Sequence, residues 1–289
     1  MELRQLRYLD AVARRRSFTQ AALDLHVAQS AISQQVGRLE RELGAELLRR
    51  TTRRVEVTEM GELVLARARR ALAEVEGARA DLDAVQGLVR GRLRLGGLPP
   101  VGPVHPAALI ADFSRAHPGI AVTVRAGVAS PLLGELRASG LDLVLALVDP
   151  DAFDGLDGVR LFEEELVVIA SLDHPIARAK RVRVERLAGE PLVTYASGSA
   201  LRDALLALVP GGRVVAEAND LETVRELTAR GLGVSLMPQS VVASHGDRLA
   251  IRPLSPRQAL PLSLVWRAGE RPTPAAQAFR EHVLLSMHS

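Results

Sequence analysis

The stretch "SFTQAALDLHVAQSAISQQVGRLERELG", residues 17–44, decides the N-terminal fold. It contains two helical patterns, and only His26 and Val27 separate them. Ser17 and Gln20 fit a capping box, in which each side chain satisfies a free backbone N–H group at the start of the first helix. A short helix, a tight turn and a second helix are the plan of a helix-turn-helix, whose second helix enters the major groove of DNA.

The second of these helices has two unlike faces. Its apolar residues recur at helical spacing and form one core-facing stripe: Ile32, Val36, Leu39 and Leu43. The opposite face has hydroxyl and amide groups where charges are usual: Ser30, Ser33, Gln34 and Gly37, with Gln29 at its shoulder and Arg41 one turn further. Such groups donate and accept hydrogen bonds, so they can read base edges, and glutamine suits adenine. A solvated polar face is the alternative, and the helix-turn-helix context favours base reading.

Two further elements flank this pair. Before it, apolar residues at helical spacing predict a first helix: Leu3, Leu6, Leu9, Val12 and Ala13. After it comes "LLRRTTRRVEVTEMG", residues 47–61, in which Val55, Glu56 and Val57 alternate as in a strand. This segment predicts a small β-wing, and its arginines suit phosphates or a minor groove: Arg49, Arg50, Arg53 and Arg54. A solvated hairpin with surface arginines is the alternative.

The charge distribution agrees with a polyanionic partner for the N-terminal end. Residues 1–58 hold 11 arginines against 7 acidic residues, a net of +4, whereas residues 91–289 hold 21 basic and 21 acidic residues. The excess positive charge therefore lies where the helix-turn-helix lies. Chance unevenness in a short segment is the other explanation.

A long helix is predicted next, from Glu59 to about Val89, because the segment has no proline and is rich in helix-forming residues. Apolar residues recur there at alternating steps of four and three: Val64, Ala68, Ala71, Val75, Ala78, Leu82, Val85 and Val89. This heptad pattern is typical of a coiled coil and predicts a dimer. A single helix that lies on its own domain is the alternative.

Length and composition exclude several classes of site. The 289 residues suffice for about two domains. There is no cysteine, which excludes disulfides, thiolate metal sites and cysteine nucleophiles. The N-terminus lacks the apolar run of a signal peptide, and no stretch approaches the length of a membrane span, so we expect the chain in the cytoplasm.

The C-terminal two hundred residues alternate between strand-like and helix-like segments. Apolar runs occur at residues 120–124, 141–147, 166–170, 192–194, 214–216, 233–236 and 262–266. This alternation predicts an α/β arrangement with mostly parallel sheets. We expect a division into two lobes near residues 163–165, with a return to the first lobe at Trp266 and Arg267.

The sequence contains no complete catalytic or cofactor motif. The seven histidines are scattered, and none has metal-ligand spacing. Ser199 in "SGSAL" lacks the second glycine of a G-x-S-x-G elbow. "GLGVSL", residues 231–236, has Leu236 where a dinucleotide fingerprint has its third glycine, and there is no P-loop. We therefore expect no enzyme, no cofactor and no metal site.

Residues 2–61 resemble the winged helix-turn-helix of LysR-type transcriptional regulators, and a more diffuse similarity continues to the end of the chain. The resemblance implies base contacts from Gln29, Ser30, Ser33 and Gln34, with Arg53 in the wing. Two positions depart from the family. Ala28 replaces the Ser or Thr usual at the start of the recognition helix, which loses a cap of about 0.5–2 kcal/mol, and Leu48 replaces a phenylalanine.

The resemblance also implies a fold of three parts. Residues 1–58 form the DNA-binding domain, residues 59–90 the dimerising linker helix, and residues 91–289 an effector-binding domain. That domain is expected to be two-lobed and α/β, like type 2 periplasmic-binding proteins, with lobe I at about 91–163 and 267–289 and lobe II at about 164–266. The whole chain is thus a multi-domain α+β protein.

A cleft between such lobes is the expected effector site. The resemblance places these residues along it: Pro99, Pro100, Val101, Ser130, Val148, Ser197, Ser199 and Met237. The three serines are expected to precede helices, where hydroxyl and free N–H groups can hold a carboxylate; a role only as N-caps is the alternative. Pro99 and Pro100 remove two backbone donors. We expect a small carboxylate with an apolar or aromatic body.

These observations together predict a sequence-specific, DNA-binding transcriptional regulator controlled by a small-molecule effector. Its expected partners are double-stranded promoter DNA and a second copy of the chain, joined through the linker helix and assembling further into a tetramer. An enzyme with an appended DNA-binding domain is the rival, and a catalytic motif after residue 90 would favour it. A small-molecule carrier would leave the basic helix-turn-helix unexplained.

Overall fold

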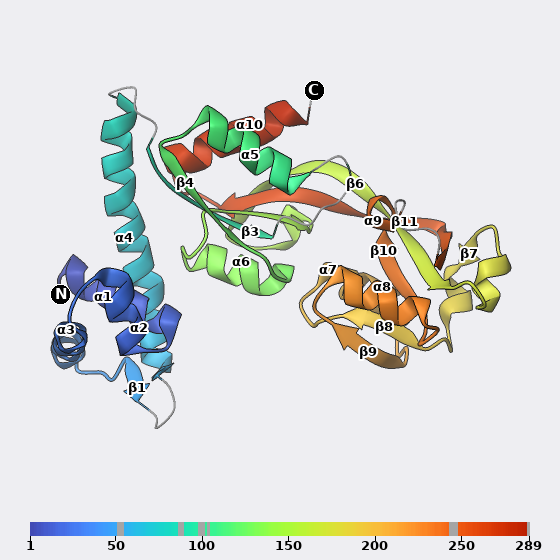
Figure 1. Ribbon diagram of the computed structural model, residues 1–289, viewed down its shortest axis with the longest axis horizontal. Coiled ribbons are helices and arrows are strands. Elements are labelled where there is room, and N and C mark those ends of the chain that lie inside the picture. Colours follow the sequence, from blue (N-terminus) through green and yellow to red (C-terminus); the bar gives the residue numbers. More distant parts are fainter. Residues whose placement is uncertain (51–54, 86–89, 98–101, 103–104, 243–247, 288–289) are drawn as a thin grey trace. The chain divides into compact units, whose positions relative to one another are not determined.

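The computed structural model describes residues 1–289 except 51–54, 86–89, 98–101, 103–104, 243–247 and 288–289 (Figure 1). The chain divides into two compact units. The N-terminal unit is Met1–Leu88, with which the short segment Ala138–Gly140 is grouped, and the C-terminal unit comprises Val89–Arg137 and Leu141–Ser289. Among the described residues, no helix combines the length and apolar character that a membrane crossing requires.

The N-terminal unit is a helix-turn-helix with a wing. Its elements are α1 (Leu3–Arg15), α2 (Phe18–Leu25), α3 (Gln29–Leu43), β1 (Leu48–Arg50), β2 (Val55–Val57) and α4 (Glu59–Val85). The predicted apolar stripes meet in one core, which includes Leu6, Leu9, Val12, Ile32, Val36 and Leu39. Ser17 caps α2 as predicted, because its hydroxyl accepts a hydrogen bond from the Gln20 N–H at 3.3 Å. Ala28 gives α3 no side-chain cap.

The wing is tied to the recognition helix by one carboxylate. Strands β1 and β2 pair antiparallel, with Arg50 opposite Val55. The Glu40 side chain on α3 accepts hydrogen bonds from the backbone N–H groups of Leu47 at 2.9 Å and Leu48 at 3.1 Å. Leu48 is buried, so the departure from phenylalanine is a core change. The wing is also bonded at Val55, whose N–H donates to the Arg16 carbonyl at 3.1 Å, so both α3 and the end of α1 hold it.

Helix α4 differs from the predicted coiled-coil seam in its first half. Leu65 and Ala68 are buried in the core of the N-terminal unit, and Val64 packs against that core. The prediction that Val64 and Ala68 face a second chain is therefore wrong for Ala68 and incomplete for Val64. The reason is that α4 packs against α1 and contributes these residues to the core of the unit. Further along, Leu82 is 65% exposed, and residues 86–89 lie outside the described part of the helix.

The first lobe of the C-terminal unit contains β3 (Gly91–Gly97), α5 (Pro106–Ala116), β4 (Ile120–Arg125), α6 (Ala129–Arg137), β5 (Leu143–Leu147), η1 (Pro150–Ala152) and α10 (Pro274–Ser286). Strand β3 pairs parallel with both β4 and β5. Helices α5 and α10 lie side by side (Figure 1), and the rings of Phe113 and Phe279 meet edge to face at 5.0 Å. This contact packs the C-terminal helix onto lobe I.

The second lobe contains η2 (Pro175–Arg178), β7 (Val182–Arg183), η3 (Val184–Leu187), β8 (Leu192–Tyr195), α7 (Ala200–Leu208), β9 (Val214–Ala218), α8 (Leu221–Ala229), β10 (Ser235–Pro238) and α9 (Gln239–Val242). Strands β8 and β9 pair parallel. Each is followed by a helix, so the starts of α7 and α8 lie near the carboxyl ends of these strands. This arrangement positions helix starts at one edge of the lobe.

Two long strands join the lobes. They are β6 (Leu156–Ser171) and β11 (Leu249–Arg267), which pair antiparallel and run together between the lobes (Figure 1). The sheet order is β10-β6-β11-β5-β3-β4, with β7 also paired to β11. The prediction of mostly parallel sheets is therefore wrong for this sheet, because a chain that crosses once in each direction makes an antiparallel ribbon. Strand β11 already pairs with β5 at Leu262, so the return to lobe I precedes Trp266 and Arg267.

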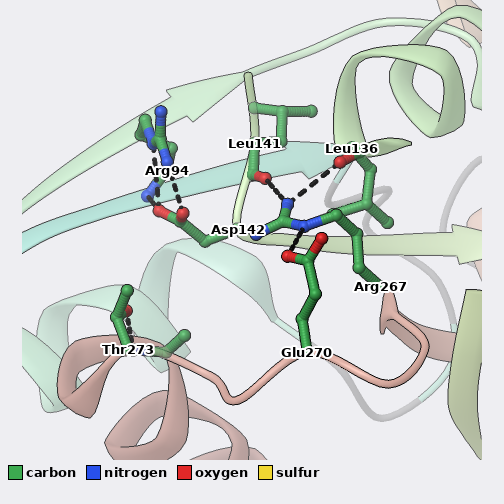
Figure 2. A network of polar contacts seen from close by, with 8 residues as sticks. Arg94, Leu136, Leu141, Asp142, Arg267, Glu270 and Thr273 are labelled. Atoms are coloured by element: carbon green, nitrogen blue, oxygen red, sulfur yellow. Dashed lines mark hydrogen bonds and ion pairs between the residues drawn. The ribbon is translucent and has the colours of Figure 1, made fainter. Parts of the chain in front are cut away.

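A polar network holds the lobe I end of this ribbon (Figure 2). Arg267, the last residue of β11, donates to the carbonyl oxygens of Leu136 at 2.9 Å and Leu141 at 2.8 Å. Nearby, the buried carboxylate of Asp142 accepts two hydrogen bonds from the Arg94 guanidinium, at 2.6 and 3.1 Å, and one from the Arg94 N–H at 2.8 Å. These contacts fix α6, β3 and β11 relative to one another.

Candidate functional site

The exposed face of α3 is polar and uncharged over most of its length. At about 100° per residue, one arc of about 100° holds Ser30, Ser33, Gln34, Gly37 and Arg41. The buried stripe of the helix lies on the opposite side. Ser30 and Gln34 are exposed, Ser33 is half-buried, and Gln29 is exposed at the edge of the arc. The helix thus presents the predicted hydroxyl and amide groups outward.

Gly37 has no packing role within the described chain. A Cβ placed on it would meet no described atom within 4 Å, so no neighbouring segment of the described unit approaches it closely. The Arg41 side chain folds back along the helix, and its Nε donates to the Gly37 carbonyl at 3.2 Å. A glycine inside a helix costs about 1 kcal/mol relative to alanine. Nothing in the described fold compensates for that cost.

The predicted wing residues are described only in part. Arg49 is exposed, and its guanidinium lies 3.9 Å from the Glu46 carboxylate. At that distance the pair is weak and leaves the arginine accessible to a phosphate. The side chain of Arg50 and the whole of Arg53 lie outside the described residues.

A cavity of about 300 Å³ opens between the two lobes of the C-terminal unit. Lobe I contributes Gly97 at the end of β3, residues 126–129 before and at the start of α6, and residues 145–147 of β5. Lobe II contributes Tyr195, residues 199–201 at the start of α7, residues 219–221 at the start of α8, and Pro238. The wall thus consists of strand ends and helix starts, the usual composition of a ligand site in α/β folds.

The structure brings only some of the predicted effector residues to this cavity. Ser199 lines it and is the N-cap residue of α7. Ser130 is the second residue of α6, so the prediction that it precedes the helix is wrong. Its backbone N–H crosses between the lobes and donates to the Gly198 carbonyl at 3.1 Å. Ser197 is exposed and lies outside the described lining.

Val148 and Met237 are buried in the lobe cores and do not line the cavity. Val148 packs with α6 residues in a cluster of lobe I, and Met237 is fully buried in lobe II. Their neighbours Leu147 and Pro238 do line the cavity. Met237 and Pro238 are successive residues of β10, and successive side chains of a strand point to opposite faces, so an offset of one residue separates the wall from the core there. Val148 directly follows the end of β5. Pro99, Pro100 and Val101 lie outside the described residues.

Three polar residues of the cavity wall were not predicted from the sequence: Tyr195, Asn219 and Asp220. Asp220 caps α8, and its carboxylate accepts a hydrogen bond from the Thr223 N–H at 2.8 Å. This bond lowers the pKa of Asp220. An Asp before a helical pattern is a recognisable N-cap signal, so this residue could have been found. Tyr195 is 5% exposed, and burial raises the pKa of its phenol; a tyrosine at a strand end gives no such signal.

The comparison with known families covers both units. The family described as "Bacterial regulatory helix-turn-helix protein, lysR family" matches residues 3–62, and the "LysR substrate binding domain" matches residues 86–287. The chain belongs to the LysR family. It is a DNA-binding transcriptional regulator with an effector-binding domain, and its helix-turn-helix carries α3 as the recognition helix.

Relatives with different names match this LysR-family regulator almost equally well. A "Hydrogen peroxide-inducible genes activator" of Dickeya chrysanthemi is 34% identical, with 99% of this chain and 97% of the relative covered. A "RuBisCO operon transcriptional regulator" of Allochromatium vinosum is 33% identical, with 98% and 96% covered. The full-length structure of a cysteine-to-aspartate variant of OxyR from Pseudomonas aeruginosa has a TM-score of 0.78 and 29% identity, with 100% of this chain and 95% of that chain covered.

Proposed function

We propose that α3 reads promoter sequence through Gln29, Ser30, Ser33 and Gln34. The observation that carries this assignment is the outward, uncharged polar face of α3 opposite its buried stripe. Hydroxyl and amide groups can pair with base edges in the major groove, whereas a carboxylate there would meet repulsion from phosphates. Arg49, Arg50 and Arg53 are assigned to the DNA backbone or the minor groove. DNA binding places the regulator in the cytoplasm.

The test of base reading is Gln34→Ala, measured by fluorescence anisotropy on a cognate promoter duplex and on a random duplex. We expect a loss of about 1–3 kcal/mol on the cognate duplex and a much smaller loss on the random one. The matched control is Gln239→Ala, the same change at an exposed glutamine in the C-terminal unit. Equal losses on both duplexes for Gln34→Ala would show that the residue does not read bases.

We also propose that two copies associate through α4 and that such dimers form the tetramer. Apolar side chains of α4 remain exposed, among them Met60, Leu63 and Leu82. An apolar hollow of about 500 Å³ lies beside the first half of α4, lined by Met1, Leu6, Leu43, Leu63, Val64, Arg67, Ala68 and Ala71. A two-fold dimer presents two recognition helices to half-sites about 34–36 Å apart.

Leu82→Glu tests this assembly. The substitution replaces an exposed apolar side chain on α4, so it should leave the fold of the unit unchanged and weaken the association of copies. We expect sedimentation to show loss of dimers and promoter binding to weaken with it. An unchanged oligomer would show that this part of α4 does not join the copies. Glu74→Gln, at another exposed α4 residue, is the control.

The inter-lobe cavity is proposed as the effector site. A molecule bound there contacts both lobes, so it stabilises one relative arrangement of the lobes over others. Such differential binding is what couples an effector to promoter affinity. The expectation that the effector is a small carboxylate comes from the helix starts alone.

Peroxide sensing through a thiol is not assigned to this chain. One relative is named for induction by hydrogen peroxide, and one related structure carries a replaced cysteine. Peroxide oxidises a cysteine thiolate to a sulfenic acid, which can form a disulfide. This chain has no cysteine, so that reaction has no substrate here. The absence of a thiol favours regulation by a bound molecule.

A further inference from the structure

The wall of the inter-lobe cavity has an unusual charge composition for the site of an anionic effector. Among its described lining residues, Asp220 is the one side chain that is ionised at neutral pH, and none is Arg, Lys or His. The nearest arginines along the chain already have partners: Arg125 pairs with Glu135, and Arg202 with Glu217.

The helix starts at the cavity are less available to an anion than the sequence indicated. At α6, the Ser130 N–H is used by the Gly198 carbonyl, and Pro131 has no N–H to offer. At α8, the Asp220 carboxylate itself occupies the position of an anion and accepts from the Thr223 N–H. At α7, Ser199 lines the cavity, and its side chain makes no capping hydrogen bond.

The fixed charges at the cavity largely offset one another. A helix N-terminus is equivalent to about half a positive charge. The starts of α6, α7 and α8 together are therefore equivalent to about one and a half positive charges, of which the Asp220 carboxylate cancels one. About half a positive charge remains, with no cationic side chain among the described lining residues to balance a carboxylate. Burial in such a wall removes the hydration that an ionised ligand needs.

We propose that the cavity binds an uncharged molecule with an apolar body and one or two neutral polar groups, and that it rejects carboxylates. This inference rests on the proposed effector role of the cavity. Alanine, valine and leucine side chains supply most of the wall, and the Ser199 hydroxyl and Asn219 amide can both donate and accept. A volume of about 300 Å³ lies at the small end of ligand sites.

The test compares acids with their amides on the full-length protein. The probes are benzoate against benzamide, and cyclohexanecarboxylate against cyclohexanecarboxamide, measured by saturation-transfer NMR and calorimetry. Small compounds of this size reach dissociation constants of about 1–10 mM. We expect at least one amide to bind and its acid to bind about tenfold more weakly or not at all. An acid that binds as tightly as its amide, or two silent amides at about 10 mM, would overturn the proposal.

Asp220→Asn tests whether the Asp220 carboxylate is the charge that weakens the binding of acids. Asparagine is as good an N-cap as aspartate, so the variant keeps the start of α8 and removes only the negative charge. We expect acid binding to rise about tenfold and amide binding to stay unchanged. The matched control is Asp203→Asn, which removes an exposed charge of α7 that does not line the cavity. If Asp220→Asn binds the acids as weakly as the unmodified protein does, the Asp220 carboxylate is not what excludes them.

Promoter affinity measured with and without each probe separates this proposal from the effector role. A bound amide that leaves promoter affinity unchanged would contradict the effector role and support the ligand class. A bound acid that shifts promoter affinity would contradict the ligand class and support the effector role.

Discussion

The α3 face that we propose reads DNA and the wall of the proposed effector cavity are built from different kinds of structure. The α3 face belongs to one helix, and the core lies wholly behind it. The cavity wall collects separate segments of two lobes, and several of its residues are also core residues, such as Leu145 and Leu201. Recognition and stability are therefore separable on α3 and inseparable at the cavity.

The largest effect should come from the scaffold of the cavity. Asp142→Ala removes a buried carboxylate that accepts three hydrogen bonds from Arg94, and loss of hydrogen bonds to a charged group costs about 1.5–3 kcal/mol. Trp266 is the single tryptophan of the chain and lies at the end of β11, so its fluorescence in urea reports the unfolding of the C-terminal unit.

The control for this substitution is Asp112→Ala, whose partner Arg115 is exposed and whose pair should contribute about 0–1 kcal/mol. A change in Asp142→Ala no larger than that of the control would mean that the scaffold tolerates the loss. It would also remove the contrast between the cavity and α3.

A smaller and opposite effect is expected at the start of α3. Ala28→Ser supplies a side-chain oxygen where the helix has no side-chain cap, which should stabilise the N-terminal unit by about 0.5–2 kcal/mol. The helical circular dichroism signal should persist to a higher urea concentration, while the fluorescence of Trp266 reports no change. A stability gain seen equally by both signals would show that the two units do not unfold separately.

The smallest change in stability should come from Gly37→Ala, and it sharpens the comparison most. The added methyl group meets no described atom, so helix propensity should stabilise the unit by about 0.5–1 kcal/mol. On the DNA side the methyl group should obstruct the close approach of the duplex and weaken promoter binding. Gly134→Ala, an open helical glycine of α6, should stabilise without changing promoter affinity. Unchanged DNA binding in Gly37→Ala would remove Gly37 from the reading face.

The sequence predicted the N-terminal unit better than the cavity for a physical reason. The boundaries of α2, the burial of Ile32 and Val36 and the exposure of Gln34 follow from helical periodicity, which is a local property. Ser199 was placed at the cleft by the family resemblance, and a serine before a helix is a local signal that agrees with that placement.

The remaining wall depends on contacts between distant segments. Val148 and Met237 each lie one position from a lining residue. An apolar run in the sequence does not determine which of two successive residues faces the cavity. The use of the Ser130 N–H by Gly198 cannot be read from either segment alone. The coiled-coil prediction for α4 was wrong at Ala68 for a similar reason. Periodicity identifies an apolar face of a helix but does not show which surface covers it.

The hydrogen bond from the Ser130 N–H to the Gly198 carbonyl sets a scale for the equilibrium between closed and open lobes. It joins α6 of lobe I to the loop before α7 of lobe II, so separation of the lobes at this point breaks it. A net contribution of about 0.5–1.5 kcal/mol means that this bond, taken alone, biases the closed arrangement by roughly two- to thirteenfold. A bias of that size leaves both arrangements populated. A ligand that binds only the closed arrangement, at about ten times its dissociation constant, favours that arrangement by about 1.4 kcal/mol, which is comparable to the bias from this bond.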